Sequence, residues 1–256
     1  MSRLPDGLLR VPIAHRALHD ADAGRPENSL AALRAAIDAG YPAEIDLQLS
    51  SDGQAMVFHD YALDRLTSEK GAIRQRSARE LGDILLNNSD ETIPTLARVL
   101  EEVGGRVPLL IEVKDQDGAL GTGVGQLERA VARDLARYDG EAAVMSFNPH
   151  SVAALRALAP DLPLGLTTGP LRKESWGLVP EAVRKRLREI PDVKTVDADF
   201  ISHHANELAH PRVKEIRDSG IPVLCWTIRD DKAEAKAREY ADNVTFEGYR
   251  AVIPAT

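Results

Sequence analysis

Charged residues interrupt two apolar stretches of this sequence at a spacing of two. Glu44 and Asp46 lie within one stretch, and Glu112 and Lys114 follow a Leu-Leu-Ile run in another. Because successive side chains of a strand point to opposite faces, each pair would share one face. Two carboxylates at the end of a buried strand repel each other and lose solvation, so they need a cation or hydrogen bonds as compensation.

These carboxylates suit a hard divalent cation. Mg²⁺ and Ca²⁺ prefer carboxylate, water and phosphate oxygens, whereas the single cysteine, Cys225, offers little to a zinc or iron–sulfur site. The alternative is that the charges only mark strand ends that face solvent. Recurrence of the pattern on a second strand favours a metal site.

Two histidines stand near these carboxylates at the ends of apolar runs. His15 precedes Arg16, and His59 precedes Asp60. Each histidine alone could be structural or exposed, but histidine titrates in the range that general acid–base catalysis needs. Arg16 adds a bidentate donor suited to phosphate. Together these residues predict acid–base chemistry beside a metal and a phosphate.

Apolar, β-branched runs alternate with Ala/Leu-rich stretches along the chain, which predicts strands that alternate with helices. The expected strands are centred on Pro12–Ala14, Ala43–Leu49, Pro108–Lys114, Ala142–Phe147, Leu162–Leu166, Thr195–Ile201, Ile221–Ile228 and Asn243–Glu247. The expected helices are Ser29–Ala39, Thr95–Val103, Gly125–Tyr138, Ser151–Ala159, Pro180–Glu189, Asn206–Ser219 and Asp231–Tyr240.

This alternation indicates βαβ units and a parallel sheet. Eight strands in 256 residues favour one domain, a closed (β/α)8 barrel over 1–256. The stretch 61–91 fits less well and predicts an excursion after the second strand, with a short helix near Ala78–Leu85. Ser29 or Asn28, and Ser151, are expected to cap helices. Barrel enzymes place their sites at the C-terminal ends of the strands, where the charged residues fall.

Charge and hydropathy exclude some classes of function. The formal net charge of −8 argues against nucleic acid as the main partner. No run approaches the roughly 18 apolar residues of a membrane span, and the N-terminal residues lack an apolar secretory segment. We therefore expect a cytoplasmic protein without membrane insertion. The sequence does not predict an oligomeric state.

An ordered set of motifs resembles the glycerophosphodiester phosphodiesterase family, over nearly the whole chain. The motifs are His15-Arg16, Pro26-Glu27-Asn28-Ser29, Glu44-Ile45-Asp46, Ser51-Asp52-Gly53, His59-Asp60, Asp64-Arg65-Leu66-Thr67, Ile93-Pro94-Thr95-Leu96, Glu112-Val113-Lys114, Ser146-Phe147 and Trp226-Thr227. The order and spacing of the whole set make the resemblance specific.

The resemblance implies a (β/α)8 barrel with a small insertion after the second strand and a glycerophosphodiester as small-molecule substrate. It implies that His15 and His59 are the general acid and base. The implied ligands of one divalent cation, Mg²⁺ or Ca²⁺, are Glu44, Asp46 and Glu112. The residues that it places around the phosphate and the rest of the substrate are Arg16, Lys114, Glu27, Trp226, Phe147 and Glu247.

Three positions depart from the family pattern. Ala17 stands where the family usually has glycine after His-Arg, and its methyl group is expected to narrow the approach to the phosphate. Arg229 replaces an asparagine shortly after Trp-Thr, and Phe246-Glu247 replaces a late Thr-Asp signature. These departures leave open how the glycerol or leaving group is held.

Several other features are expected to be structural. Gly121-Thr-Gly-Val-Gly125 lacks the Lys-Ser/Thr of a phosphate loop and predicts a turn before a helix, one that could border the substrate. Asp197 and Asp199 are expected to share a strand face in a structural or solvent role. His203 and His204 follow that strand and could touch substrate, but a surface loop is favoured, and His19 is a minor candidate near His15.

Two alternatives remain open. A related barrel phosphodiesterase could act on lysophospholipids or phosphoinositides; this predicts an apolar groove or a membrane-facing segment, and the sequence shows no such segment. A non-catalytic binding protein could keep the motifs, although the complete set of carboxylates and histidines argues against it.

Overall fold

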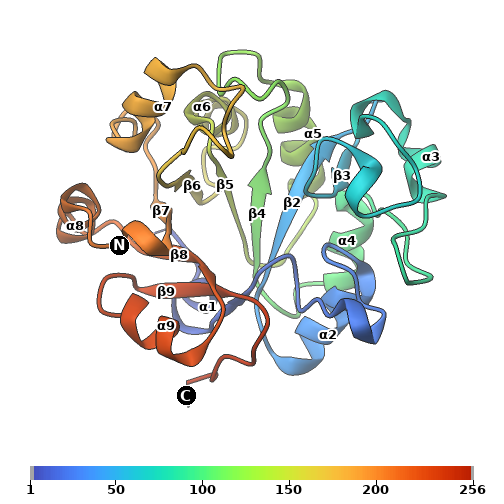
Figure 1. The fold of residues 1–256 in the computed structure, drawn as a ribbon, viewed down its shortest axis with the longest axis horizontal. Helices are drawn as coiled ribbons and strands as arrows, with labels where there is room; N and C mark the ends of the chain where they lie inside the picture. The colour runs from blue at the N-terminus through green and yellow to red at the C-terminus, as the bar shows by residue number, and fades with distance from the viewer. Residues whose placement is uncertain (1–2, 255–256) are drawn as a thin grey trace.

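Eight parallel strands close into a barrel in the computed structural model, which describes residues 3–254 (Figure 1). Strand β1 pairs with both β2 and β9, which closes the sheet. The parallel strands are β1 Ile13–Ala14, β2 Ala43–Leu49, β4 Leu109–Val113, β5 Ala142–Ser146, β6 Leu164–Thr168, β7 Phe200–His204, β8 Val223–Ile228 and β9 Asn243–Phe246. The predicted (β/α)8 architecture is confirmed.

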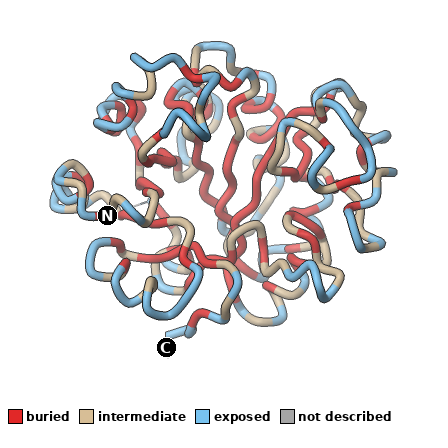
Figure 2. Tube along the Cα trace, viewed as in Figure 1, coloured by how far each residue is buried: buried red, intermediate tan, exposed pale blue. Residues whose placement is uncertain are grey.

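Helices surround the barrel and pack against its outer face (Figure 1). They are α2 Leu30–Ala39, α4 Leu96–Val103, α5 Gln126–Leu135, α6 Pro149–Leu158, α7 Glu181–Arg188, α8 Pro211–Asp218 and α9 Asp231–Ala237. The strands form the buried centre, and the outer faces of the helices are exposed (Figure 2). Among the described residues, no helix has both the length and the apolar composition to cross a membrane.

Local signals explain where several helices begin and end. The Ser29 hydroxyl accepts a hydrogen bond from the Ala32 N–H and starts α2, and Gly40 ends it at φ 76°. The predicted cap at Ser151 is wrong. Asn148 caps α6, with Pro149 in its first turn, because the Ser151 hydroxyl donates instead to a buried carboxylate.

The seventh parallel strand lies later than predicted. Thr195–Ile201 was expected, but β7 begins at Phe200, because the chain before it forms a turn in which Asp197 has φ 50°, outside the extended region. Asp197 and Asp199 therefore do not share a strand face. Both pair with Arg3, and Asp199 also pairs with Arg156, so their role is structural.

Several short elements were not predicted or were predicted differently. Strand β3 Ala55–Val57 runs antiparallel to β2, and α1 Asp6–Arg10 precedes the barrel. The expected helix Asn206–Ser219 is divided into the 3₁₀ turn η4 Ala205–Glu207 and α8. Pro211 in the first turn of α8, with His210 as its cap, sets this boundary.

The segment between β3 and α4 forms its own small apolar cluster beside the barrel. It contains the 3₁₀ turns η2 Leu63–Arg65 and η3 Ile73–Gln75 and the helix α3 Ala78–Gly82. Helix α3 begins where the sequence predicted and ends earlier than Leu85, and Ser77 and Glu80 form its capping box. This segment brings Asp60 and Tyr61 to the mouth of the barrel.

The barrel interior changes from apolar to charged along its axis. One end is filled by inward-facing apolar side chains, and helix α1 adds Leu8 to this cluster. Toward the carboxyl ends of the strands the inward positions become Glu44, Asp46 and Glu112. Because the lower layer is packed with apolar atoms, the charged groups are confined to one open end.

We expect Gly165→Ala to destabilise the barrel. A Cβ at Gly165 in β6 would overlap with the ring of buried Phe200. Urea unfolding should show a loss of about 1–3 kcal/mol in the free energy of unfolding. The control is Gly82→Ala, where a Cβ meets no atom within 4 Å. Equal effects of the two substitutions would contradict this account of the interior.

Candidate active site

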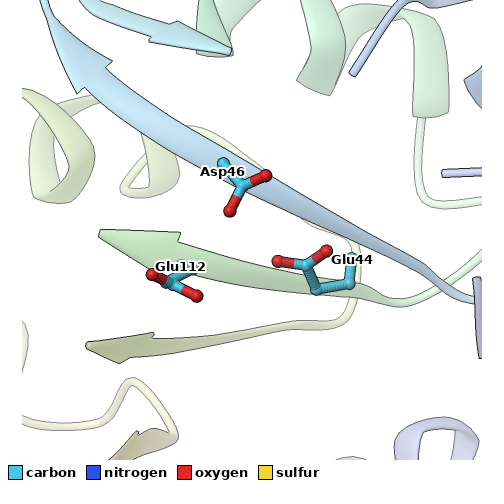
Figure 3. Close-up of side chains that lie close together, drawn as sticks. All are labelled: Glu44, Asp46 and Glu112. Atoms are coloured by element: carbon cyan, nitrogen blue, oxygen red, sulfur yellow. The ribbon is translucent and has the colours of Figure 1, made fainter. Parts of the chain in front are cut away.

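Three carboxylates meet at the open end of the barrel. Glu44 and Asp46 lie on β2, and the strand register places Asp46 opposite Glu112 on β4 (Figure 3). Their oxygens lie within 4.8 Å of one another, and each residue is at most 6% exposed. The shared strand face predicted from the sequence is therefore present. Three buried hard-oxygen donors at this separation fit Mg²⁺ or Ca²⁺.

Lys114 neutralises part of this charge. Its ammonium lies 2.7 Å from Oδ1 of Asp46 and 2.7 Å from Oε1 of Glu112. Burial acts to lower the pKa of Lys114, but the two carboxylates outweigh burial and hold the pKa above its ordinary value. Burial and the neighbouring carboxylates raise the pKa of Glu44 well above its ordinary value. The cluster therefore has a strong demand for positive charge.

The loop after β1 fixes two of the carboxylates. The backbone N–H of Arg16 donates to Oε2 of Glu44 at 2.8 Å. The Asn28 amide donates to Oδ2 of Asp46 at 2.9 Å, and its oxygen accepts from the Asp46 N–H. Asn28 is buried and has φ 60°. Asn28 lies in the Pro26–Ser29 motif, from which only a helix cap was predicted at this position.

His15 is held by a carboxylate from the last strand. Its Nδ1 lies 2.5 Å from Oε2 of Glu247. An ionised carboxylate only accepts hydrogen bonds, so Nδ1 carries the proton and Nε2 is left for the cavity. Burial lowers the pKa of His15, and the Glu247 carboxylate opposes that effect. The hydrogen bond from His15, together with nearby His19 and Arg229, holds the pKa of Glu247 well below its ordinary value.

His59 has a matching partner. Its Nδ1 lies 2.6 Å from Oδ1 of Asp60. Arg65 donates to both oxygens of Asp60 and to both oxygens of Glu27 at 2.6–2.8 Å. Glu27 in turn accepts from Nη1 of Arg16 at 2.7 Å. A continuous chain of charged hydrogen bonds thus links the surroundings of His59 to Arg16.

These groups face one cavity of about 850 Å³. Of the residues predicted from the sequence, those that line it are His15, Arg16, Glu44, Asp46, His59, Glu112, Lys114, Phe147 and Trp226. Glu27 and Glu247 are not among the lining residues, and they contact Arg16 and His15 instead. Apolar residues also line the cavity, and of these the sequence did not predict Leu120, Leu171, Trp176 and Val179.

The remaining histidines separate into two groups. The expectation of a surface loop at His203 and His204 is wrong, because both lie in β7. His203 is buried with Nδ1 against the Thr168 hydroxyl, and burial lowers its pKa to about 4. His204 lines the cavity and contacts the ring of Trp226. His19 lies 3.7 Å from Glu247 and is not among the lining residues.

Comparison with known proteins agrees with this geometry. The model of the glycerophosphoryl diester phosphodiesterase family matches residues 15–245. The chain belongs to this family. It is therefore a phosphoric diester hydrolase, and the predicted resemblance is confirmed.

Individual members are similar over nearly their full lengths. A glycerophosphodiester phosphodiesterase of Caldanaerobacter subterraneus subsp. tengcongensis is 30% identical over 239 residues, which cover 89% of this chain and 91% of the relative. A phosphodiesterase structure from Oleispira antarctica is 26% identical with a TM-score of 0.74 and covers 93% of both chains. A Thermotoga maritima structure at 24% identity and TM-score 0.68, covering 92% of this chain and 94% of its own, shows the same fold.

The family position after His-Arg bears on the backbone here. Ala17 has φ 63°, a left-handed conformation that glycine adopts more easily. Its side chain is 2% exposed and packs in the core, and it does not line the cavity. The expectation that its methyl group narrows the approach to the phosphate is therefore wrong.

The residues at the other two departures from the family pattern, Arg229 and Glu247, contact each other. Nη2 of Arg229 lies 2.6 Å from Oε1 of Glu247, whose second oxygen faces His15. Glu247 thus places one carboxylate oxygen against His15 and the other against Arg229.

We expect Glu247→Gln to lower the pKa of His15 further. The carboxylate favours the charged imidazolium, so removing its charge favours the neutral ring. NMR titration of the His15 ring protons measures the shift directly. Arg229→Gln is the matched control, since it keeps the carboxylate. A His15 pKa that is unchanged or raised in Glu247→Gln would contradict this assignment.

Proposed function

We propose that this phosphodiesterase hydrolyses glycerophosphodiesters to sn-glycerol 3-phosphate and an alcohol, with His15 and His59 as the acid–base pair. The observation that carries the proposal is that both imidazoles line one cavity and both have Nδ1 against a carboxylate. Each ring therefore offers Nε2 to a substrate. The Oleispira antarctica relative is described in complex with the product sn-glycerol-3-phosphate.

A divalent cation completes the proposed site. Glu44, Asp46 and Glu112 would hold Mg²⁺ or Ca²⁺, since all three offer buried carboxylate oxygens. When bound, the cation neutralises phosphoryl charge and lowers the pKa of a hydroxyl near it. The raised pKa of Glu44, which comes first from burial and then from repulsion by Asp46 and Glu112, supports this proposal, because a bound cation favours the ionised carboxylate.

Arg16 and Lys114 would hold the phosphate. Both side chains line the cavity, and each is at most 18% exposed. Nε of Arg16 is buried and has no hydrogen-bond partner among the described residues. Because Glu27 already holds Nη1, the guanidinium plane is fixed before the substrate arrives. A fixed donor loses little freedom on binding.

The histidines would act in turn on two bonds. One ring takes the proton of the glycerol 2-hydroxyl as its oxygen attacks phosphorus, and the other protonates the alcohol oxygen as its bond to phosphorus breaks. The resulting cyclic phosphate is opened when water attacks phosphorus and the bond to the 2-oxygen breaks. In this second step the two rings exchange roles, because the ring that gave up its proton can now act as the base and the ring that took a proton can act as the acid.

We expect His15→Ala and His59→Ala each to lower kcat by about 10²–10⁴-fold, because each removes one proton-transfer group. Release of sn-glycerol 3-phosphate from glycerophosphocholine measures the loss. His210→Ala on the N-cap of α8 is the control, and circular dichroism confirms folding. Near-full activity in either active-site variant would contradict the two-histidine proposal.

We expect removal of divalent cations to abolish turnover and to lower the thermal midpoint. EDTA should inactivate the enzyme, and Mg²⁺ or Ca²⁺ should restore it. The added cation should also raise Tm in the wild type by binding the native state, and not in Asp46→Asn. This Tm readout is independent of turnover. Full activity in EDTA would contradict metal dependence. If no phosphodiester were cleaved with either cation present, the result would favour the alternative of a non-catalytic binding protein.

A further inference from the structure

We propose that this enzyme prefers glycerophosphodiesters whose alcohol part carries a negative charge of its own, a carboxylate or a second phosphate. Arg172 and Arg229, which line the cavity, would select that charge. The proposal rests on the proposed function, because it concerns the alcohol that the same reaction releases. The acid–base roles proposed for His15 and His59 are the same for every alcohol.

Charge is distributed unevenly around the cavity. Among the described residues, the carboxylates that line it are those of Glu44, Asp46, Asp60, Glu112 and Asp115. Arg172 lies in the loop after β6, and Arg229 directly follows β8. Since β7 and β8 lie across the closed barrel from β2 and β4, the cavity has an acidic side at β2 and β4 and a basic side at β6 to β8 (Figure 1).

The two arginine charges converge on His204. This residue ends β7, the strand between β6 and β8, and lines the same cavity. Burial lowers the pKa of His204, and the positive charges of Arg172 and Arg229 lower it further, against the opposing effect of Glu207. Both guanidinium charges therefore act at one place, although they come from separate loops.

The ion pair of Arg172 is weak. Its Nη2 lies 4.0 Å from Oε1 of Glu207, beyond hydrogen-bond distance, and its side chain is 68% exposed. A guanidinium has five N–H donors in a planar fork that fits a carboxylate or a phosphate. Ser175 and Asn206 also line the cavity and can add neutral hydrogen bonds. An anion that enters here meets a cation that Glu207 does not fully neutralise.

Arg229 is fixed in place but keeps donors for a ligand. Its Nη2 lies 2.6 Å from Oε1 of Glu247, and its side chain is 65% exposed. The other oxygen of Glu247 lies against His15, so that carboxylate is shared between two partners. The guanidinium has further N–H donors to offer. Because Glu247 already restricts the guanidinium, Arg229 loses little conformational freedom when it binds an anion.

The alcohol is the part of the substrate that can bring a further charge to the basic side. Glycerol is uncharged, and the proposed phosphate ligands Arg16 and Lys114 both lie against Asp46 on the acidic side. The alcohol extends from that phosphate into the rest of the cavity. A cationic alcohol such as choline meets like charge there, whereas a carboxylate or a phosphate meets opposite charge.

The test compares substrates that differ by one negative charge in the alcohol. Glycerophosphoserine differs from glycerophosphoethanolamine by a carboxylate, and bis(glycerophospho)glycerol differs from glycerophosphoglycerol by a second glycerophosphate group. Initial release of sn-glycerol 3-phosphate, counted per phosphodiester bond, gives kcat/KM for each substrate. We expect the charged member of each pair to have the higher kcat/KM. Arg172→Gln and Arg229→Gln should each lower the ratio within a pair by about two- to fivefold, as exposed ion pairs do.

The change of this ratio on substitution is the decisive measurement, because a carboxylate also alters the intrinsic reactivity of the leaving alkoxide. A ratio of two substrates also cancels any general loss of turnover that Arg229→Gln causes through Glu247 and His15. Added NaCl should lower the wild-type ratio, since it screens exposed charges, and should have less effect in the double variant.

Arg137→Gln is the control. Arg137 follows α5, is exposed and does not line the cavity, so this substitution changes the net charge equally without contact to the substrate. A fall for only one pair would restrict the preference to that group. Ratios that stay unchanged in both arginine variants, or that fall equally in Arg137→Gln, would overturn the proposed preference alone. Release of sn-glycerol 3-phosphate from none of the four substrates by the wild type would overturn the proposed function instead.

Discussion

Repulsion among three buried carboxylates is the constraint on which the rest of this site depends. Glu44, Asp46 and Glu112 lie within one cation's reach of each other in an environment that resists charge. Such a group is stable only where positive charge and hydrogen bonds are supplied. Lys114 and the Arg16 loop supply both, and that demand for positive charge is also what makes the site suitable for a divalent cation and a phosphate.

The barrel satisfies this constraint through the alternation of its strands. The inward-facing side chains of β2 and β4 lie side by side because the two strands pair in register. Three carboxylates can therefore meet without a contribution from any loop residue. Apolar residues fill the same inward positions at the other end, where Leu8 of α1 closes the interior. The charged layer therefore has one open side, and substrate can reach it only from the carboxyl ends of the strands.

Features that depend on the local residue pattern could be predicted from the sequence, whereas features that depend on contacts between distant residues could not. Glu44 and Asp46 could be placed on one face because the alternation of side chains is a property of a single strand. The start of β7 was missed because a run of apolar and β-branched residues does not reveal that Asp197 takes a left-handed backbone conformation just before the strand. Arg229 and Glu247 were visible in the sequence only as two separate departures from a family pattern, and the apolar residues that line the cavity, such as Phe147, come from distant parts of the chain.

The two histidines are oriented by carboxylates that come from different parts of the chain. His59 takes its carboxylate from the next residue, so that pair is set by local sequence and steadied by Arg65. His15 takes its carboxylate from Glu247, at the far end of the chain. Arg229 pairs with Glu247 and also lines the cavity. One arginine thus connects the carboxylate that orients His15 with the lining of the cavity.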